Sequence, residues 1–302
     1  MNGDAPTIRN ALTVDVEDYF QVSALAPHIP RSSWDSRDCR IERNVDRILG
    51  LFDDHGAKAT FFTLGWIAER YPQAVRRIVD AGHELASHGY GHERVSDLDA
   101  QAFRDDIDRA RKILEDISGT PIRGYRAPSF SIGTKNLWAL EVLRETGHHY
   151  SSSIYPVRHD HYGMPEAPRH PHRPLGLQGV LELPPATMTL RGRNLPAGGG
   201  GYFRLLPYAV SRMALNRINR HDGMSGIFYF HPWEIDPGQP RVPGVSLKTR
   251  FRHYLNLHRM ESRLGRLLTD FSWGRMDQVF ARHLLDTPET QVAYAAAPAG
   301  RA

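Results

Sequence analysis

Short runs of apolar and β-branched residues alternate along the chain with segments in which apolar residues recur every three or four positions. The short runs predict strands, over residues 11–15, 59–64, 83–87, 122–126, 149–153, 180–183 and 227–231. The periodic segments predict amphipathic helices, because that spacing places side chains on one helical face. Their apolar positions are Ile41, Val45, Ile48, Leu49 and Phe52, then Phe103, Ile107, Ala110, Leu114 and Ile117, then Leu137, Leu140 and Leu143.

The alternation of strands with helices predicts the α/β class and a parallel sheet covered by helices. Seven strands fit an irregular (β/α)7-type barrel, closed or partly closed, over residues 1–244. In such barrels the working side chains lie at the carboxyl ends of the strands. Residues 245–285 have a helical pattern and are expected to form an extension packed on the barrel, followed by a disordered tail over residues 286–302.

Composition and charge narrow the classes of protein that this chain can belong to. Its 302 residues carry a formal net charge of +4. The basic residues are scattered along the sequence, mostly as single arginines, and form no basic stripe, so no nucleic-acid partner is expected. Cys39 is the single cysteine, which rules out a disulfide framework within the chain. The sequence has no evident secretory signal and no transmembrane segment. We therefore expect a cytoplasmic protein, with action near the inner membrane as a further option.

The polar residues of greatest interest stand at predicted strand ends. Asp15, Glu17 and Asp18 close the first strand in the run LTVDVEDYF, where three carboxylates repel one another unless a cation or an arginine neutralises them. His88 and His92 follow the third strand in the run SHGYGH. Two glycines between the histidines allow the backbone to bend, so that both imidazoles can face one cation.

Two further strand ends carry cationic or ionisable groups. Arg126 ends the fourth strand in the run GYRAPSF, where it can neutralise a carboxylate, and Pro128 fixes the turn that follows. His231 ends the apolar strand IFYFH. Each of these residues alone has an ordinary structural explanation. Together with two histidines and a carboxylate, they indicate a hydrolase site, because that ligand set leaves positions on zinc open for water and substrate.

The order of these motifs resembles the polysaccharide deacetylases of carbohydrate esterase family 4, the NodB-homology type. The five family motifs are matched in order by VDVED, SHGYGH, RAPSF, YSSSIYP and YFH, over residues 11–233. The runs DVEDYFQV, HPWEIDP and RFRHYLNL resemble the branch associated with bacterial exopolysaccharide and exosortase loci. A glycine-rich run, PAGGGGYFR, lacks the frame of a phosphate-binding loop and is not interpreted as one.

The resemblance implies a role for each of these residues. Asp15 would be the general base, oriented and charge-stabilised by Arg126. His88 and His92 would bind one divalent cation, with zinc expected and Co2+, Ni2+ or Mn2+ as alternatives. His231 would be the general acid that protonates the leaving amine.

The third metal ligand is open between two carboxylates. The family pair is two adjacent aspartates, whereas Val16 follows Asp15 in this chain. Strand alternation places Glu17 on the same side as Asp15 and favours it, while an early end of the strand would turn Asp18 inward. Both residues are therefore kept as candidates.

The reaction implied by the resemblance removes N-acetyl groups from amino sugars of a polysaccharide, an exopolysaccharide or its precursor, and releases acetate. The residues expected against the sugar are Tyr125, Pro128, Phe130, Tyr155 and Trp233, and a backbone N–H near Tyr155 would assist the oxyanion. Two alternatives remain. One is hydrolysis of a small cyclic amide or ureide on the same fold, and the other is a carbohydrate-binding protein with weak activity.

The fourth motif departs from the family pattern. An aspartate that bonds the catalytic histidine is usual there, whereas the matching stretch of this chain reads YSSS. A serine cannot stabilise an imidazolium by charge, so another carboxylate is expected beside His231. The candidates are Glu182 on the sixth strand and Asp160 in the long loop, and Glu182 is better placed because strand positions are more rigid.

Overall fold

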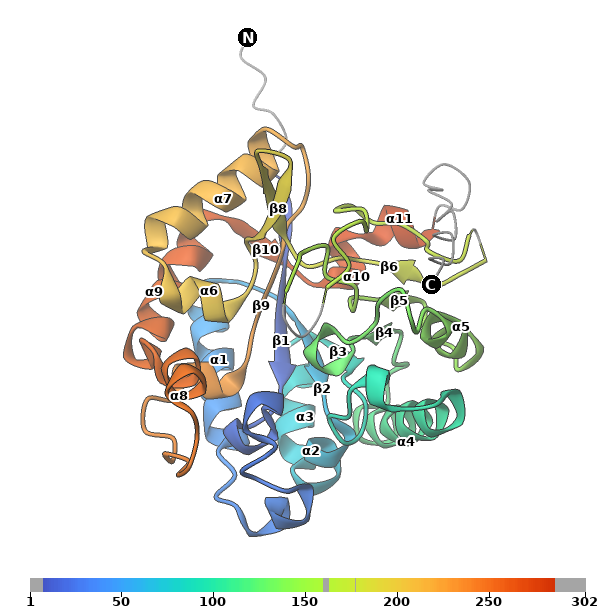
Figure 1. Ribbon diagram of the computed structural model, residues 1–302, viewed down its shortest axis with the longest axis vertical. Helices are drawn as coiled ribbons and strands as arrows, with labels where there is room; N and C mark the ends of the chain where they lie inside the picture. Colours follow the sequence, from blue (N-terminus) through green and yellow to red (C-terminus); the bar gives the residue numbers. More distant parts are fainter. Residues whose placement is uncertain (1–7, 160–162, 177, 286–302) are drawn as a thin grey trace, which may run out of the picture.

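The computed structural model describes residues 8–159, 163–176 and 178–285. Within these residues a mostly parallel sheet curves into a half-barrel surrounded by helices (Figure 1). All seven predicted strands are present, so the predicted α/β fold class is confirmed. They are β1 (Arg9–Val16), β2 (Thr60–Thr63), β3 (Glu84–Ser87), β4 (Gly124–Tyr125), β5 (Tyr150–Ser151), β6 (Leu181–Glu182) and β9 (Ile227–Phe230).

Strand β1 lies at the centre of the sheet. One edge of β1 pairs with β9. The other edge pairs with two strands in succession: β10 (Ser272–Gly274) lies beside residues 9–11, and β2 lies beside residues 13–16. From β2 the sheet continues through β3, β4 and β5 to β6, and every pair is parallel. The carboxyl ends of these strands therefore lie along one edge of the sheet.

Between β6 and β9 the chain adds a small antiparallel hairpin of β7 (Thr187–Leu190) and β8 (Arg193–Pro196). The hairpin is followed by α6 (Gly200–Leu205) and α7 (Tyr208–Arg220). Within the described residues β6 and β9 do not pair, so the barrel stays open there. The sequence pattern did not predict the hairpin, because most of its residues are partly or fully exposed and do not alternate.

The three predicted helices form as α1 (Ile41–Asp54), α4 (Ala100–Ser118) and α5 (Trp138–Glu145). Most of their predicted apolar positions are buried, whereas Leu49, Ile117 and Leu137 are half-buried. Two unpredicted helices, α2 (Gly65–Arg70) and α3 (Pro72–Asp80), lie between β2 and β3. They are separated by one residue, and a proline begins the second, so their apolar pattern is too short and interrupted for a periodicity argument.

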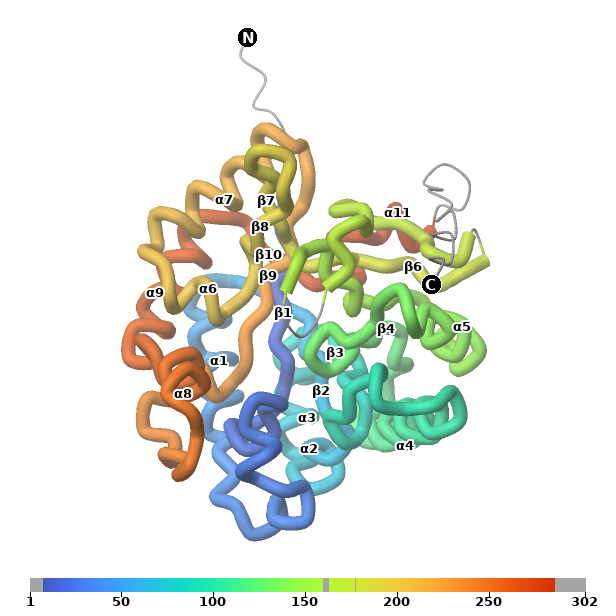
Figure 2. The backbone as a smooth tube through the Cα atoms, in the orientation of Figure 1, coloured from blue at the N-terminus to red at the C-terminus, as the bar shows by residue number. Residues whose placement is uncertain are grey.

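After β9 come α8 (Leu247–Tyr254), α9 (Leu257–Asp270), β10, α10 (Met276–Val279) and α11 (Ala281–Leu285). The expected extension is thus mainly helical, but it also adds β10 to the sheet, a strand of three residues that is too short for a pattern. Figure 2 shows this segment, in orange to red, against β9 and β1. The expected tail lies outside the described residues. Among those described, no helix combines the length and apolar character that crossing a membrane requires.

Candidate active site

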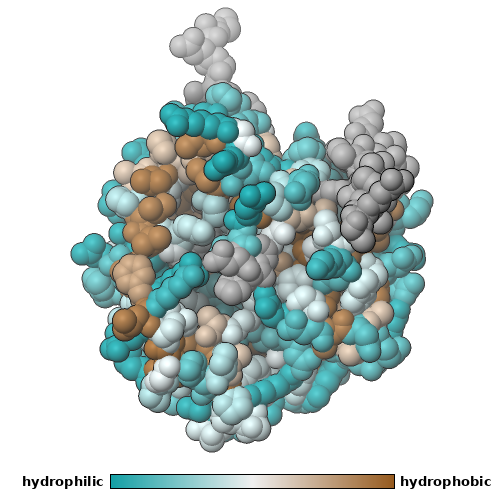
Figure 3. All heavy atoms as spheres, viewed as in Figure 1, coloured by the Kyte–Doolittle hydropathy of each residue, from teal (hydrophilic) through white to brown (hydrophobic). Residues whose placement is uncertain are grey.

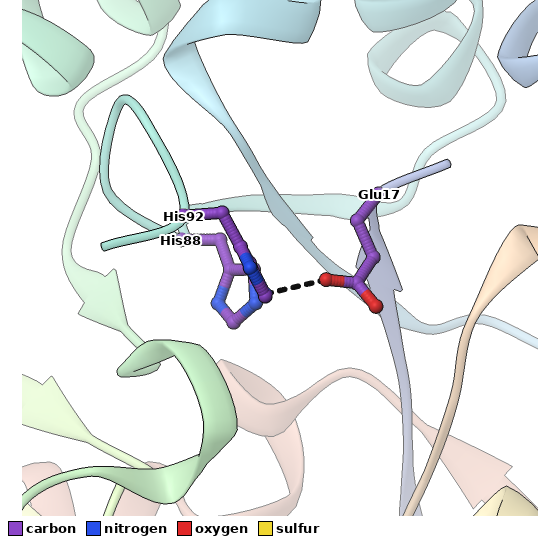
Figure 4. Close-up of side chains that lie close together, drawn as sticks. All are labelled: Glu17, His88 and His92. Atoms are coloured by element: carbon purple, nitrogen blue, oxygen red, sulfur yellow. Dashed lines mark ion pairs between the residues drawn. The ribbon is translucent and has the colours of Figure 1, made fainter. Parts of the chain in front are cut away.

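Three side chains from two strand ends converge in the site (Figure 4). Glu17 follows β1, His88 and His92 follow β3, and one candidate ligand atom of each lies within 4.8 Å of the others. The buried Oε2 of Glu17 accepts no hydrogen bond of good geometry from the described residues, although Nε2 of His92 lies 2.5 Å away. A carboxylate oxygen and a ring nitrogen that face each other in this way are suited to sharing a cation.

The protonation of the cluster also fits a cation. Nδ1 of His88 donates to the carbonyl oxygen of Arg126 at 2.7 Å, which leaves Nε2 as the ligand atom. Burial lowers the pKa of His88 to about 4, so its ring is neutral at pH 7. Burial raises the pKa of Glu17, but His92 and other histidines outweigh burial and hold the pKa well below its ordinary value. An anionic carboxylate with neutral imidazole is a donor set that suits zinc.

The loop between the two histidines is held by Asp106 of α4. Its Oδ2 accepts from the Tyr90 N–H at 2.8 Å and its Oδ1 from the Gly91 N–H at 3.1 Å. A Cβ on Gly89 would lie 2.6 Å from Oδ2, so glycine permits this close approach. His92 adopts a left-handed φ of 54°, which is unfavourable without such support. Asp106 was not predicted, since it is one of five acidic residues on α4 and its type alone does not set it apart.

Asp15 and Arg126 form a buried ion pair beside the cluster. Nη1 of Arg126 donates to Oδ1 of Asp15 at 2.6 Å and to the Thr13 hydroxyl at 2.8 Å. Its other nitrogens donate to the backbone and side-chain oxygens of Ser152, and the guanidinium lies 4.1 Å over the ring of Phe62. The arginine is therefore fixed on several sides, and its hydrogen bond holds Oδ1 of Asp15 in place.

His231 is held by a carboxylate that the sequence analysis did not select. Its Nδ1 lies 3.0 Å from Oε2 of Glu234, and Arg204 donates to Oε1 of Glu234 at 2.8 Å. Nε2 of His231 faces the interior, 3.9 Å from Asp15 and 3.6 Å from Glu17. Burial lowers the pKa of His231, but the carboxylates of Glu17, Glu234 and Asp15 outweigh burial and raise it to about 9. The ring is protonated at pH 7, as a general acid must be.

The expected pairing of Glu182 with His231 is wrong. Oε1 of Glu182 accepts from the N–H groups of Ser153 and Ile154 at 2.7 and 2.8 Å, and burial raises its pKa to about 7. The other candidate, Asp160, lies outside the described residues. Glu234 takes the place beside His231 because the turn after β9 brings it back within three residues.

That turn is the 3-10 helix η6 (Pro232–Ile235), which His231 and Glu234 close as a capping box. The signal was present in the sequence as a cap residue, a proline and an acid at the third helical position, the spacing of an N-terminal cap. Gly200 makes room for the acid, since a Cβ there would lie 2.1 Å from Oε2 of Glu234. The glycine-rich run therefore packs against this turn.

Asp18 does not face the cluster. Its carboxylate accepts from the backbone N–H groups of Tyr19 and Arg40 and caps the 3-10 helix η1 (Tyr19–Gln21). Burial raises its pKa to about 6. Of the two carboxylates left open by the sequence, the fold brings Glu17 together with the histidines.

Trp233 is not available to stack on a sugar. Its ring is buried and stacks with His231 and His253, whose ring centroids are 5.2 and 4.3 Å away. Its Nε1 donates to Oε1 of Glu17 at 3.1 Å. The indole therefore braces a candidate metal ligand and the candidate acid at once.

The other residues expected against the sugar are also buried. Tyr125 is 1% exposed and packs edge-on against Phe103 and His148. Phe130 and Tyr155 pack together, with ring centroids 5.2 Å apart. Pro128 is buried at the start of a 3-10 helix after β4. These side chains are packed in the interior, so their surface is largely closed to a sugar.

Comparison with known proteins agrees with this geometry. Residues 32–151 match the polysaccharide deacetylase family, and residues 152–281 match a domain of unknown function. Residues 32–151 therefore form a polysaccharide deacetylase domain of NodB type. A crystal structure from Mycobacterium smegmatis, of a protein assigned to the polysaccharide deacetylases, shares the fold with a TM-score of 0.60 and 21% identity over 96% of both chains.

The curated relatives align with only part of the chain. A peptidoglycan deacetylase of Helicobacter pylori is 33% identical over 115 residues, which are 37% of this chain and 38% of the relative. A peptidoglycan-N-acetylglucosamine deacetylase of Bacillus cereus is 34% identical over 96 residues, 32% of this chain and 35% of the relative. A chitooligosaccharide deacetylase of Azorhizobium caulinodans is 36% identical over 121 residues, 34% of this chain and 55% of the relative. The chain thus spans between about a third and just over half of these relatives.

Proposed function

We propose that this chain is a metal-dependent hydrolase that removes N-acetyl groups from amino sugars of a polysaccharide and releases acetate. One observation carries the proposal: a cation-binding cluster, a carboxylate held by an arginine and a histidine held by a carboxylate meet at one edge of the sheet. Each of these groups performs one step of amide hydrolysis. The names of the curated relatives support the same reaction.

A divalent cation held by Glu17, His88 and His92, with zinc as the first choice, would polarise the acetyl carbonyl and lower the pKa of a water molecule. Asp15 accepts the proton of the attacking water through Oδ2, because Arg126 occupies Oδ1. The water oxygen forms the new bond to the acetyl carbon. The carbon–nitrogen bond then breaks and leaves acetate.

His231 supplies the proton that the leaving amine needs. Its Nε2 lies 3.9 Å from Asp15 and 3.6 Å from Glu17, and Glu234 holds Nδ1 so that Nε2 keeps this direction. Glu234 is in turn fixed by Arg204. The amine leaves as a neutral group once the proton has been transferred, so the sugar product carries a free amino group.

The relatives named for peptidoglycan and chitooligosaccharide support a substrate glycan that contains N-acetylglucosamine. The resemblance to the exopolysaccharide branch makes an exopolysaccharide or its precursor a further candidate substrate. Acetate release should be measured from chitooligosaccharide, peptidoglycan and an N-acetylated exopolysaccharide. We expect release that stops with a chelator and returns with zinc. Opening of a hydantoin-like ring without acetate release from any glycan would contradict the proposal.

A further inference from the structure

Most of the exposed large apolar side chains among the described residues lie in one part of the chain. Of nine such residues, seven fall between positions 190 and 251, on the β7–β8 hairpin, α6, α7 and α8: Leu190, Leu195, Tyr202, Leu205, Met213, Leu247 and Phe251. Figure 3 shows hydrophobic atoms as a brown band along the left-hand edge, where Figure 1 places α7, α6 and α8. Such a concentration marks an interaction surface rather than scattered exposure.

Helices α6 and α8 are joined by polar contacts beneath this surface. The Arg204 guanidinium on α6 donates to the carbonyl oxygens of Arg252 and Leu255 at 3.2 and 2.6 Å. On α8, Leu247 is 83% and Phe251 57% exposed, four positions apart and so on one helical face. We call Tyr202, Leu205, Leu247 and Phe251 the α6–α8 face. Because Arg204 fixes one helix against the other, the face is a rigid feature of the fold.

The charge on this part of the chain is positive. Residues 183–221 include six arginines, residues 237–260 include four arginines and one lysine, and neither range contains Asp or Glu. The three acidic residues between the two ranges, Asp222, Glu234 and Asp236, all pair with arginines. On α7, Arg212 pairs with an aspartate of α9.

Other arginines around the face have no such partner. Arg193 on β8 and Arg250 and Arg252 on α8 are exposed, and none of them forms an ion pair with a carboxylate of the described residues. The exposed apolar side chains are therefore bordered by unpaired positive charge.

We propose that the α6–α8 face binds peripherally to a membrane surface that contains anionic lipids. Leu247 and Phe251 enter the boundary between headgroups and acyl chains, while Arg250 and Arg252 contact lipid phosphates. An apolar hollow of about 720 Å³ beside α6, lined in part by Tyr202 and Leu205 on the same helix, extends the surface that acyl chains can reach. This binding is independent of the proposed deacetylation.

Two other occupants fit the face less well. A second copy of the chain, related by a two-fold axis, would bring the same patch against itself and so place arginine near arginine. A polyanionic polymer would pair with the arginines but would gain nothing from exposed leucine and phenylalanine side chains. Apolar groups bordered by cations match the boundary layer of an anionic bilayer.

The test is co-sedimentation of the full chain with vesicles of phosphatidylcholine, alone or mixed with phosphatidylglycerol. We expect binding only to the mixed vesicles, and weaker binding as salt is added. The double variant Leu247→Ser/Phe251→Ser should lose vesicle affinity by about tenfold or more. The double variant Arg250→Glu/Arg252→Glu should lose about 25-fold or more, since each cation near a lipid surface contributes about fivefold and the new carboxylates are repelled by the anionic surface.

The matched control is Leu175→Ser, which changes an exposed leucine outside the face and should bind vesicles as the parent does. Absence of vesicle binding, or equal binding by the parent and the Leu247/Phe251 variant, would overturn the proposal. So would a dimer in sedimentation velocity that this variant abolishes. Acetate release from a soluble chitooligosaccharide should be equal in all variants, so a failure of membrane binding and a failure of the proposed function are distinguishable.

Discussion

The two sides of the candidate active site are held in different ways. On the cation-binding side, Glu17, His88 and His92 follow strands of the sheet directly, and one helix residue, Asp106, holds the loop between the histidines. On the other side, His231 depends on a carboxylate that is fixed by an arginine of another helix. Residues at strand ends and one helix residue build the first side. On the second side the strand-end histidine depends on Glu234 in the turn after β9 and on Arg204 of α6, which precedes β9.

This second side gives a structural role to the part of the chain that matches a domain of unknown function. Residues 152–281 contribute His231, Glu234, Arg204 and Trp233. They are not a separate module, because β9 and β10 join both edges of β1 and α9 packs into the main core. Changes on the two sides should therefore have different consequences. Those at the histidine pair should affect metal binding, and those at His231 and Glu234 should affect the reaction. Trp233 bonds Glu17 and stacks on His231, so it links the two sides.

The largest effect is expected from removing both histidines of the cluster. His88→Ala together with His92→Ala leaves Glu17 as the remaining candidate ligand, so metal content should fall from about one ion per chain to about none. Elemental analysis of the purified protein measures this content. Full occupancy in the double variant would show that the cation binds elsewhere.

If Asp15 is the general base and not an essential metal ligand, its replacement should reduce activity without reducing metal binding. Asp15→Asn keeps an oxygen for the Arg126 hydrogen bond but cannot accept a proton from water. We expect kcat for acetate release to fall by roughly 10²-fold or more, with the metal content unchanged. If metal and activity are lost together, Asp15 is a ligand and another group is the base.

A smaller effect, confined to the reaction, is expected from Glu234→Gln. The amide still accepts a hydrogen bond from Nδ1 of His231, but its charge is gone, so the raised pKa of His231, about 9, should fall. Because the acid must be protonated, the alkaline limb of the kcat/KM profile should move to lower pH, and kcat at pH 8 should drop by about tenfold. An unmoved limb with normal metal content would mean that Glu234 does not act through His231.

Asp106 gives the corresponding test of the cation-binding side. Asp106→Ala removes the acceptor of two loop N–H groups, so the histidines are less well ordered before the cation arrives. We expect zinc affinity to weaken by about 10-fold to 100-fold, as measured by competition with a chromophoric chelator. Asp105→Ala, on the same helix but exposed, is the matched control. Equal affinity in the two variants would argue against a role for Asp106 in the loop.

The sequence allowed the sheet and the cluster to be predicted, because both rest on local patterns. Each of the seven strands is a short apolar run, and Asp15, His88, Arg126 and His231 stand at the ends of four of them. Asp106 escaped prediction because its partners are backbone N–H groups, which leave no mark on residue type. Glu234 was not predicted because the carboxylate was expected from distant positions, Glu182 or Asp160, whereas it lies three residues after His231 in the turn that follows β9.

The aromatic residues show a different limit of the sequence. Trp233 and Tyr125 were expected against the sugar because they lie beside the motifs. Aromatic side chains near a strand end serve equally well as packing, and nothing in the pattern separates the two uses. In the structure Trp233 is buried and stacks with two imidazole rings, so its contribution is to hold neighbouring groups in place.

The smallest expected effect concerns stability in acid on the His231 side. His253 stacks on Trp233, and its Nε2 lies 2.6 Å from Oε1 of Gln239. Burial lowers the pKa of His253 to about 3, against about 6.5 in an unfolded chain. Between these values the unfolded chain binds the proton more readily, so the contribution of this group is fully present above about pH 6.5 and is lost as the pH falls towards 3. From pH 7 to pH 5 the loss should be about 2 kcal/mol.

The variant His253→Gln removes the titrating group, so the free energy of unfolding of this variant in urea should fall less than that of the parent over this range. If the free energy of unfolding of both proteins changes equally with pH, His253 is hydrated or already protonated in the folded chain. Protonation of His253 would then not weaken the stack of His253 and Trp233 beside His231 in acid.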